Sequence, residues 1–269
     1  MFRSGEAKVI PKTVFQTYKD SRLAVPLAEN LVRNLQFAVG WSHRLFDDEM
    51  IPEYVRAAFG ANMAHRYRAI APEYGAARAD LFRYLFAYQE GGVYLDIKSQ
   101  LTRQLSDVIQ VDDCYLLGCW HNCGEAAYAS YGRDSTIANP AGEFQQWFLV
   151  AAPRHPFLEA VIHEVCRRID TYTRRSFGFG KWGTINTTGP IPYTNAIYPI
   201  LGQHAHRRVR SYTDLGFRYS MFDAPDLHHQ VLASHYTKNS GPVVRHPPTV
   251  FARNLIRSAL GSVRRRMQG

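Results

Sequence analysis

The sequence has no uninterrupted apolar run of 18 residues, the length at which a stretch becomes a candidate for crossing a membrane. Its N-terminal stretch, MFRSGEAKVIPK, also has no apolar segment of the kind found in the middle of a secretory signal peptide. The common signals for membrane insertion and export are therefore missing from this sequence. From these absences we expect a cytoplasmic protein.

Cysteine is scarce, with four residues in 269, and no two of them form a C-x-x-C pair. In a cytoplasmic chain these thiols are expected to stay reduced. Cys119, His121 and Cys123 lie close together, but no second pair of ligands follows at the spacing of a structural zinc site. The sequence therefore argues against both a disulfide framework and a zinc site.

Acidic residues are absent after Asp226, so the C-terminal end is strongly basic. The formal net charge of the chain is +9, and +7 of it lies beyond Asp226, which leaves +2 for the first 226 residues. A positive charge confined to one end argues against a general nucleic-acid-binding protein and favours a local contact with an anionic surface. The basic side chains of this end are Lys238, Arg245, Arg253, Arg257, Arg264, Arg265 and Arg266.

Residues 74–100, YGAARADLFRYLFAYQEGGVYLDIKSQ, predict a helix, a glycine stop and a buried strand. Apolar side chains recur at helical spacing before two consecutive glycines, which end helices readily because glycine adopts a positive φ at little cost. From Val93 to Lys98, apolar and polar side chains then alternate. This alternation is typical of a strand and places Tyr94, Asp96 and Lys98 on one face.

Asp80 and Arg83 are three residues apart on the predicted helix and therefore share a face. If the short connection brings this face beside the end of the strand, the two polar sets line one cleft. Open α/β sheets bind ligands in such a place, at the carboxyl ends of their strands. The alternative is an ordinary surface salt bridge beside an edge strand, and the spacing alone leaves both interpretations open.

The stretch RADLFRYLFAYQEGGVYLD resembles the core motif of glycosyltransferase family 32, which has an Asp and an Arg on a helix, then Gly-Gly and Tyr-Leu-Asp-x-Asp. The resemblance covers roughly residues 8–245 and is most specific in this stretch. It departs at one position, because Lys98 stands where the family has its second Asp. The matching residues are Asp80, Arg83, Gly91, Gly92, Tyr94, Leu95 and Asp96.

The resemblance implies a GT-A type, Rossmann-like α/β domain that moves a sugar from a UDP- or GDP-linked donor and retains its anomeric configuration. Asp80, Arg83 and Asp96 are then the expected catalytic residues. By the same resemblance, Gln16 and Tyr18 lie beside the nucleotide base. The full set of expected donor-binding residues is Gln16, Tyr18, Tyr94, Lys98, Thr188, Gly189 and Lys238.

The resemblance also implies a divalent cation, Mn²⁺ or Mg²⁺, which Asp96 and His235 are expected to hold. Lys98 leaves two alternatives open. A lysine is a compact cation that commonly contacts phosphate, so Lys98 replaces the metal ion in part. In the second alternative Lys98 turns away, and Asp96 and His235 still bind the metal.

The expected reaction is transfer to a glycan or lipid-linked acceptor in surface-polysaccharide synthesis. A glycosidase needs one protonated and one ionised carboxyl group beside the scissile bond. Asp80 and Asp96 fit that requirement poorly, because Arg83 and Lys98 favour the ionised form of both. The alternative function is a non-catalytic, membrane-associated module that binds a glycan or a nucleotide sugar, since Lys98 replaces a metal ligand.

The remaining patterns predict an α/β sandwich with a mainly parallel central sheet and flanking helices. Strands are expected at residues 8–18, 41–46 and 115–120, helices at 26–39, 143–151, 157–172 and from 190, and a mobile loop at 174–189. The helix at 26–39 is expected to bury its apolar side chains, which are Leu27, Leu31, Val32 and Leu35.

Residues 246–269 are expected to form a basic amphipathic tail after a transferase domain of residues 1–245. A helix over this tail has one apolar face and arginines around the rest. Helices of this kind lie in the plane of a membrane interface, so we expect peripheral contact with the anionic inner face of the cell membrane. The alternative is a tail that packs its apolar face on the domain. The apolar residues are Ile256, Leu260, Val263 and Met267.

Overall fold

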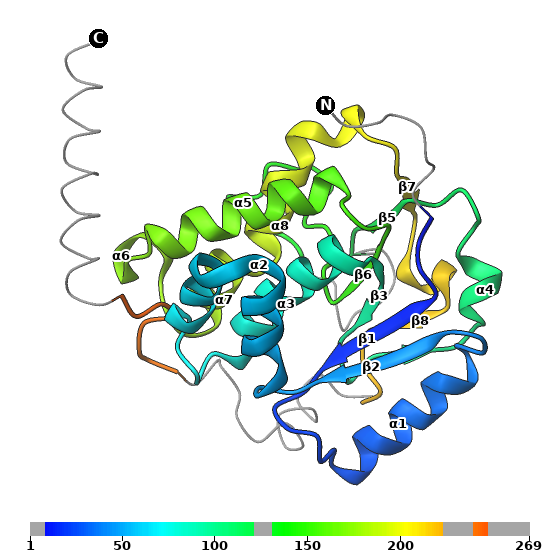
Figure 1. Cartoon of the computed structure of the whole chain (residues 1–269). Coiled ribbons are helices and arrows are strands. Elements are labelled where there is room, and N and C mark those ends of the chain that lie inside the picture. The colour runs from blue at the N-terminus through cyan, green and yellow to red at the C-terminus, as the bar shows by residue number, and fades with distance from the viewer. Residues whose placement is uncertain (1–8, 121–130, 223–238, 247–269) are drawn as a thin grey trace.

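The computed structural model describes residues 9–120, 131–222 and 239–246, which form an α/β sandwich around a six-stranded sheet (Figure 1). The strands lie in the order β2-β1-β3-β6-β5-β7. Only β6 opposes the direction of the other strands in this sheet, so the predicted mainly parallel sheet is confirmed. The bounds are β1 Thr13–Thr17, β2 Ser42–Phe46, β3 Gly92–Leu95, β5 Tyr115–Gly118, β6 Phe148–Ala151 and β7 Arg207–Val209.

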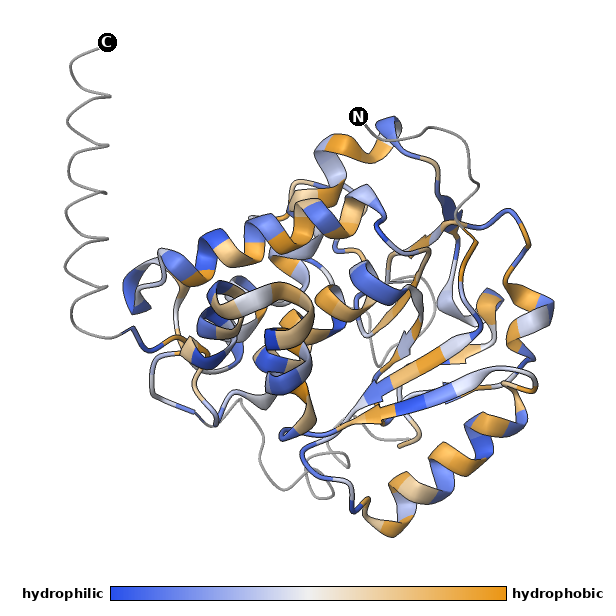
Figure 2. Cartoon of the chain, in the orientation of Figure 1, coloured by the Kyte–Doolittle hydropathy of each residue, from blue (hydrophilic) through white to orange (hydrophobic). Residues whose placement is uncertain are grey.

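Helices and a second, small sheet cover the two faces of the central sheet (Figures 1 and 2). On one face, α3 is packed against α2 and α5, and its side chains are buried on almost every side. The other face carries the pair β4–β8 together with α4 and the 3₁₀ helix η3. The bounds are α1 Val25–Gln36, α2 Met50–Ala69, α3 Gly75–Glu90, β4 Gln100–Leu101, α4 Leu105–Val108, α5 Pro156–Asp170, α6 Arg174–Phe177, α7 Gly180–Thr187, α8 Pro190–Ile197, η2 Tyr198–Gln203, η3 Tyr212–Leu215 and β8 Phe217–Arg218.

An aromatic cluster fixes α3 on the sheet. The Phe86 ring lies 4.2 Å from that of Phe15 on β1 and 5.0 Å from that of Phe46 on β2, and Phe82 lies 4.9 Å from Phe46. Buried aromatic pairs of this kind contribute about 0.5–1.5 kcal/mol beyond the burial of their area. The cluster therefore holds α3, and with it Asp80 and Arg83, at a fixed place above the strands.

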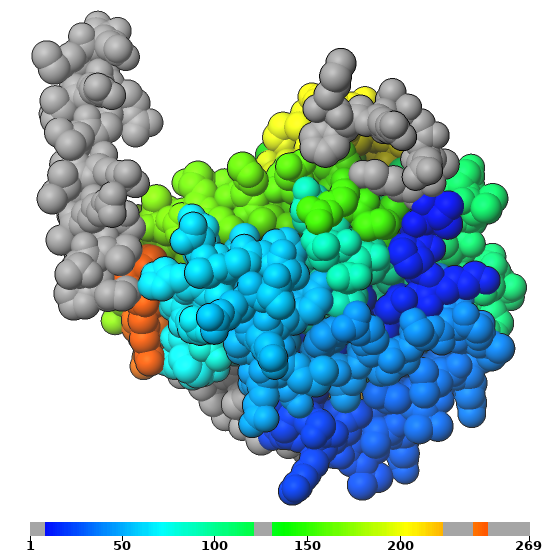
Figure 3. All heavy atoms as spheres, in the orientation of Figure 1, coloured from blue at the N-terminus to red at the C-terminus, as the bar shows by residue number. Residues whose placement is uncertain are grey.

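The orientation of α1 differs from the prediction. The helix forms as expected, but Val32 is 58% exposed and Leu35 is 39% exposed, while Asn30 and Asn34 are buried. The reason is that both asparagine side chains donate hydrogen bonds to backbone carbonyls beyond β3. Asn30 Nδ2 donates to the carbonyl of Ile97 at 3.1 Å, and the Nδ2 atoms of Asn30 and Asn34 both donate to the carbonyl of Ser99. Hydrogen bonds to the backbone carbonyls of this turn contribute more to stability than the burial of two aliphatic side chains would. Figure 3 places α1 at the edge of the molecule.

Two predicted segments have the wrong secondary structure. Residues 148–151 form the central strand β6 rather than a helix, because short apolar runs such as FLVA do not distinguish a buried strand from a buried helix. Most of residues 174–189 form two helices, α6 and α7, rather than a loop. Thr173 caps α6 by accepting a hydrogen bond from the Ser176 amide.

Within the described ranges, no helix has the length and apolar character needed to span a bilayer.

Candidate active site

Two glycines return the chain from α3 directly into β3. Gly91 has a φ of 71° and Gly92 a φ of 102°, values that favour glycine. Neighbouring backbone also excludes a side chain here, since a Cβ on Gly92 would lie 2.5 Å from the carbonyl oxygen of Thr13. The close return places the polar face of α3 beside the end of β3, as the sequence predicts.

The centre of the site is Arg83, which joins α3 to the end of β3. Its Nη2 lies 3.0 Å from Asp80 Oδ1 and its Nη1 lies 3.2 Å from Asp96 Oδ1. The side chains of Asp80 and Arg83 are only 4% and 6% exposed, whereas Asp96 is 23% exposed. The alternative interpretation, an ordinary surface salt bridge, is wrong for Asp80 and Arg83 because both side chains are buried.

Tyr94 completes the link between Arg83 and Asp96. Its hydroxyl donates to Asp96 Oδ1 at 3.0 Å, and the Arg83 guanidinium lies 4.5 Å from the centre of its ring. Burial raises the pKa of the Tyr94 hydroxyl well above its usual value, so it stays protonated and remains a donor. Tyr94, Asp96 and the helical pair therefore form one network, as expected.

Thr188 lies on the other side of Asp80. Its hydroxyl donates to Asp80 Oδ2 at 2.9 Å, so each oxygen of this buried carboxylate has a donor. Burial raises the pKa of Asp80, while Arg83 and the Thr188 hydrogen bond act in the opposite direction. Thr188 follows α7, and Gly189 precedes Pro190, which begins α8 as predicted.

Two further residues belong to this network: Tyr84, which flanks the predicted polar pair on the helix, and Gln146, which the sequence does not identify. The Tyr84 hydroxyl lies 3.0 Å from the Thr188 carbonyl and 3.1 Å from Gln146 Oε1, and these two acceptors share its one proton. The carbonyl of Gln146 accepts from Arg83 Nη1 at 2.7 Å. The sequence gives no signal for Gln146, because its segment is predicted to be helical. Tyr84, next to Arg83 on the predicted polar face, is the only one of the two with a signal in the sequence.

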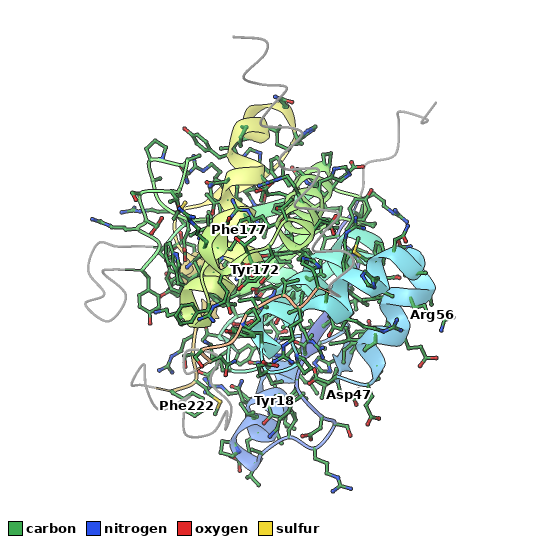
Figure 4. The ribbon with its side chains drawn as sticks, turned by 90° about the vertical axis from the view of Figure 1, so that its left-hand side faces the viewer. Tyr18, Asp47, Arg56, Tyr172, Phe177 and Phe222 are labelled. Atoms are coloured by element: carbon green, nitrogen blue, oxygen red, sulfur yellow. The ribbon has the colours of Figure 1, made fainter. Side chains whose placement is uncertain are left out.

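Gln16 and Tyr18 lie at the end of β1, beside the end of β3. Gln16 is buried, and its Nε2 is 3.4 Å from the carbonyls of both Leu95 and Asp96, while its Oε1 is 3.0 Å from His43 Nε2. Tyr18 is partly exposed and lines an open hollow with residues 19–24. Contact of these residues with a base stays a prediction. Tyr18 and Phe222 lie toward the same end of the molecule (Figure 4).

Lys98 is not on the strand. β3 ends at Leu95, and the amide of Ser99 donates to the carbonyl of Asp96 at 2.8 Å, which closes a turn. The Lys98 ammonium donates to the Tyr219 hydroxyl at 2.9 Å and lies 4.1 Å from the centre of that ring. The prediction that Lys98 and Asp96 share one strand face is therefore wrong, because the Asn30 and Asn34 contacts fold this segment into a turn.

His235 and Lys238 lie outside the described residues, so their expected roles stay predictions. The described chain before them contacts the Lys98 turn, and the described chain after them contacts the residues that precede α3. The amide of Met221 donates to the carbonyl of Lys98 at 2.8 Å, and Asn239 Nδ2 donates to the carbonyl of Glu73, just before α3, at 2.7 Å.

The described residues by themselves do not fit a divalent cation. Within residues 9–120, 131–222 and 239–246, no three His, Cys, Asp or Glu side chains are grouped to hold one. Asp96 Oδ1 already accepts hydrogen bonds from Arg83 and Tyr94. At the position of the second motif carboxylate the chain has the cation Lys98. Hard divalent cations prefer several oxygen ligands, and carboxylates above all. No step below is therefore assigned to a metal ion.

Residues 27–115 match the family described as "Glycosyltransferase sugar-binding region containing DXD motif". This match includes the whole of α3 and β3. It also includes Lys98, where the second carboxylate of a DXD motif is replaced. Together with the relatives below, the match supports a glycosyltransferase family 32-like assignment.

Two of three curated relatives are named mannosyltransferases. The "Initiation-specific alpha-1,6-mannosyltransferase" of Schizosaccharomyces pombe is 26% identical over 234 residues, which are 80% of this chain and 54% of that protein. "Inositol phosphoceramide mannosyltransferase 1" of the same organism is 25% identical over 193 residues, 70% of this chain and 51% of that protein. A "Mannosyl phosphorylinositol ceramide synthase" of Saccharomyces cerevisiae is 24% identical over 190 residues, 71% of this chain and 43% of that protein.

The chain thus spans about half the length of the curated relatives it matches. Among solved structures, the "PaToxG Glycosyltransferase" aligns with a TM-score of 0.47 and 12% identity, over 72% of this chain and 71% of that one.

Proposed function

We propose that this chain is a retaining glycosyltransferase that moves a sugar from a nucleotide-diphosphate donor to a glycan or lipid-linked acceptor. The observation that carries the proposal is the buried network of Asp80, Arg83, Tyr94 and Asp96 at the carboxyl end of β3. A buried ion pair costs desolvation that apolar side chains would avoid, which argues that this pair is kept for chemistry. The named mannosyltransferases among the relatives support the same conclusion.

Each member of the network has a task in sugar transfer. Asp80 and Arg83 are suited to hold the hydroxyl groups of the donor sugar, because one accepts and the other donates hydrogen bonds. Asp96 is the more exposed carboxylate and is suited to the nucleotide. Tyr94 and Thr188 orient the two carboxylates. The resulting preorganised charges stabilise the departing diphosphate and the developing positive charge on the sugar.

Hydrolysis by a pair of carboxyl groups fits the geometry less well. Both Asp80 oxygens already accept hydrogen bonds, from Arg83 and from Thr188, and Asp80 and Asp96 share the same guanidinium. A glycosidase needs one of its two carboxyl groups to give a proton to the leaving oxygen. The second candidate is therefore a non-catalytic module that binds a glycan or nucleotide sugar, and the observation that favours it is Lys98 in the place of a carboxylate.

The donor can be found by measuring release of nucleoside diphosphate from a panel of UDP- and GDP-linked sugars, with mannose among them. We expect one donor to be turned over by the full chain, and we expect Asp96→Asn to lower its rate by about 10²–10³-fold. Phosphatase-coupled detection of UDP and GDP measures this directly. Tight donor binding with no turnover, equal in the full chain and in Asp96→Asn, would favour the binding module.

The tail of residues 246–269, which lies almost entirely outside the described residues, is proposed to bind an anionic membrane surface near a lipid-linked acceptor. Each cation close to an anionic leaflet contributes about 1 kcal/mol. We expect the full chain to sediment with phosphatidylserine-containing vesicles but not with neutral ones, and to lose binding when truncated after Pro248. A variant in which serine replaces Arg264, Arg265 and Arg266 is the matched control for charge, because it keeps the length of the tail and removes three cations. Equal sedimentation of the truncated and full chains would rule the tail out.

A further inference from the structure

The turn that carries Lys98 is held rigidly at the edge of the candidate site. Met221 donates to the Lys98 carbonyl, and the Ser99 hydroxyl donates to the carbonyl of Tyr219 at 2.9 Å. Asn30 Nδ2 donates to the carbonyls on either side of Lys98 at 3.1 and 3.0 Å. The backbone of Lys98 is therefore positioned from two sides of the molecule, two residues beyond Asp96.

The Lys98 ammonium has a neutral partner. Among the described residues no carboxylate forms an ion pair with it, and its contacts are the hydroxyl and the ring of Tyr219. Tyr219 in turn packs against Trp120 and Trp147, whose rings lie 5.0 and 5.4 Å away. A half-buried cation held by an aromatic wall keeps its charge available for an anionic ligand.

The charges of the site balance with lysine at this position. Asp80 and Asp96 carry two negative charges, and Arg83 and Lys98 two positive ones, so the four groups sum to zero. With a second aspartate in place of Lys98 the same four positions would sum to −2, which one divalent cation would cancel. Lysine makes the same change of two charge units without an ion. A metal ion held by Asp96 would instead lie close to Arg83, whose Nη1 is 3.2 Å from Asp96 Oδ1, and like charges repel.

We propose that Lys98 takes the place of the divalent cation, so that this chain binds and releases the diphosphate of its donor without a metal ion. The proposal rests on the proposed function. In the transfer step the bond from the anomeric carbon to the phosphate oxygen breaks, and its electron pair stays with the diphosphate. The acceptor oxygen bonds to the anomeric carbon, and its proton passes to the departing phosphate or to solvent. Lys98 keeps its three protons and donates hydrogen bonds to the phosphate oxygens.

Three forms of the full chain test this: the natural one, Lys98→Asp, which restores the two-carboxylate motif, and Lys98→Met, which keeps the length of the stem but removes the charge. Calorimetric titration with GDP and UDP in EDTA measures diphosphate binding without reference to turnover. Electron paramagnetic resonance of Mn²⁺, with nucleoside diphosphate present and absent, measures metal binding to the protein. Thermal unfolding of all three forms separates loss of fold from loss of function.

We expect the natural chain to bind one nucleoside diphosphate in EDTA and to keep its transfer rate within about twofold after the chelator. Lys98→Met should weaken that binding by about tenfold or more, as the loss of one charged hydrogen bond implies. Lys98→Asp should lose binding in EDTA, gain a Mn²⁺ signal that depends on the nucleotide, and recover transfer in part when Mn²⁺ is added.

Loss of nucleotide binding and transfer by the natural chain in EDTA, with rescue by Mn²⁺, would overturn the proposal and favour Asp96 with His235 as metal ligands. It would also be overturned if Lys98→Met bound the nucleotide as tightly as the natural chain and lost only thermal stability, because Lys98 would then merely pack on Tyr219. Failure of the proposed function looks different. No donor would be turned over with or without Mn²⁺, while the binding comparison in EDTA would still decide the role of Lys98.

Discussion

We expect Asp80→Asn to lower the rate of sugar transfer by about 10²–10³-fold and to leave the free energy of unfolding unchanged within about 1 kcal/mol. Burial raises the pKa of Asp80, so its ionised form is less favourable in the folded chain than in the unfolded one. The neutral amide removes that unfavourable term. It keeps an oxygen for Arg83, and the Thr188 hydroxyl can accept from its nitrogen. Arg83 remains paired with Asp96.

Asp113→Asn is the matched control for this prediction. Asp113 is also buried and binds an arginine, since both of its oxygens accept from Arg207 at 2.6 and 2.7 Å, but it precedes the amino end of β5, whereas the site lies at the carboxyl end of β3. We expect this variant to lose about 1.5–3 kcal/mol of stability and to keep the transfer rate of the natural chain. Urea denaturation and donor turnover measured on both variants make the comparison. If Asp80→Asn lost stability and activity in the same proportion, Asp80 would be a structural residue.

The core of the site could be predicted because its signals are local. The spacing of Asp80 and Arg83 places them on one helical face, and the two glycines return the chain at once to β3. Neither step depends on a distant contact. The alternation of Val93, Tyr94 and Leu95 correctly assigns neighbouring side chains to opposite faces, since Tyr94 packs in one core cluster and its two neighbours in the other.

The parts that could not be predicted depend on distant partners. Nothing near Lys98 in the sequence indicates that Asn30 and Asn34, some 65 residues earlier, fold its segment into a turn. The same contacts leave Val32 and Leu35 of α1 exposed, although Leu27 is buried as predicted. Gln146 enters the site because β6 is inserted antiparallel between β3 and β5, an arrangement that the short run FLVA does not specify.

Contacts from distant segments of the chain converge on one residue of the network, Arg83. Arg83 contacts a helix carboxylate, a carboxylate at the end of a strand and the carbonyl of Gln146, which come from three separate segments. Burial acts to lower the pKa of its guanidinium, but the surrounding Tyr94, Asp96 and Asp80 outweigh burial and keep the pKa above its usual value. The arginine therefore stays charged and joins the two carboxylates of the site.

Arg83→Met is accordingly expected to be the most destabilising single substitution at the site, with a loss of about 3–5 kcal/mol in the free energy of unfolding at pH 8. The new side chain fills much of the same space but leaves the Asp80 and Asp96 carboxylates without their cation. The pKa of Asp80, already raised by burial, then rises further. A carboxyl group whose pKa is higher in the folded chain than in the unfolded chain destabilises the fold progressively as the pH rises above the unfolded value of about 3.9.

The destabilisation by Arg83→Met should therefore be smaller at pH 5.5 than at pH 8, because Asp80 can take up a proton at the lower pH. Urea denaturation at the two pH values measures the difference. Arg66→Met is the control, since Arg66 also pairs with a carboxylate, that of Asp170, but the two side chains are 31% and 43% exposed. Exposed ion pairs contribute about 0–1 kcal/mol to the free energy of unfolding, and we expect the loss in Arg66→Met to differ little between the two pH values. Equal losses in the two variants, or a loss at Arg83 that does not depend on pH, would show that the buried carboxylates do not need this cation.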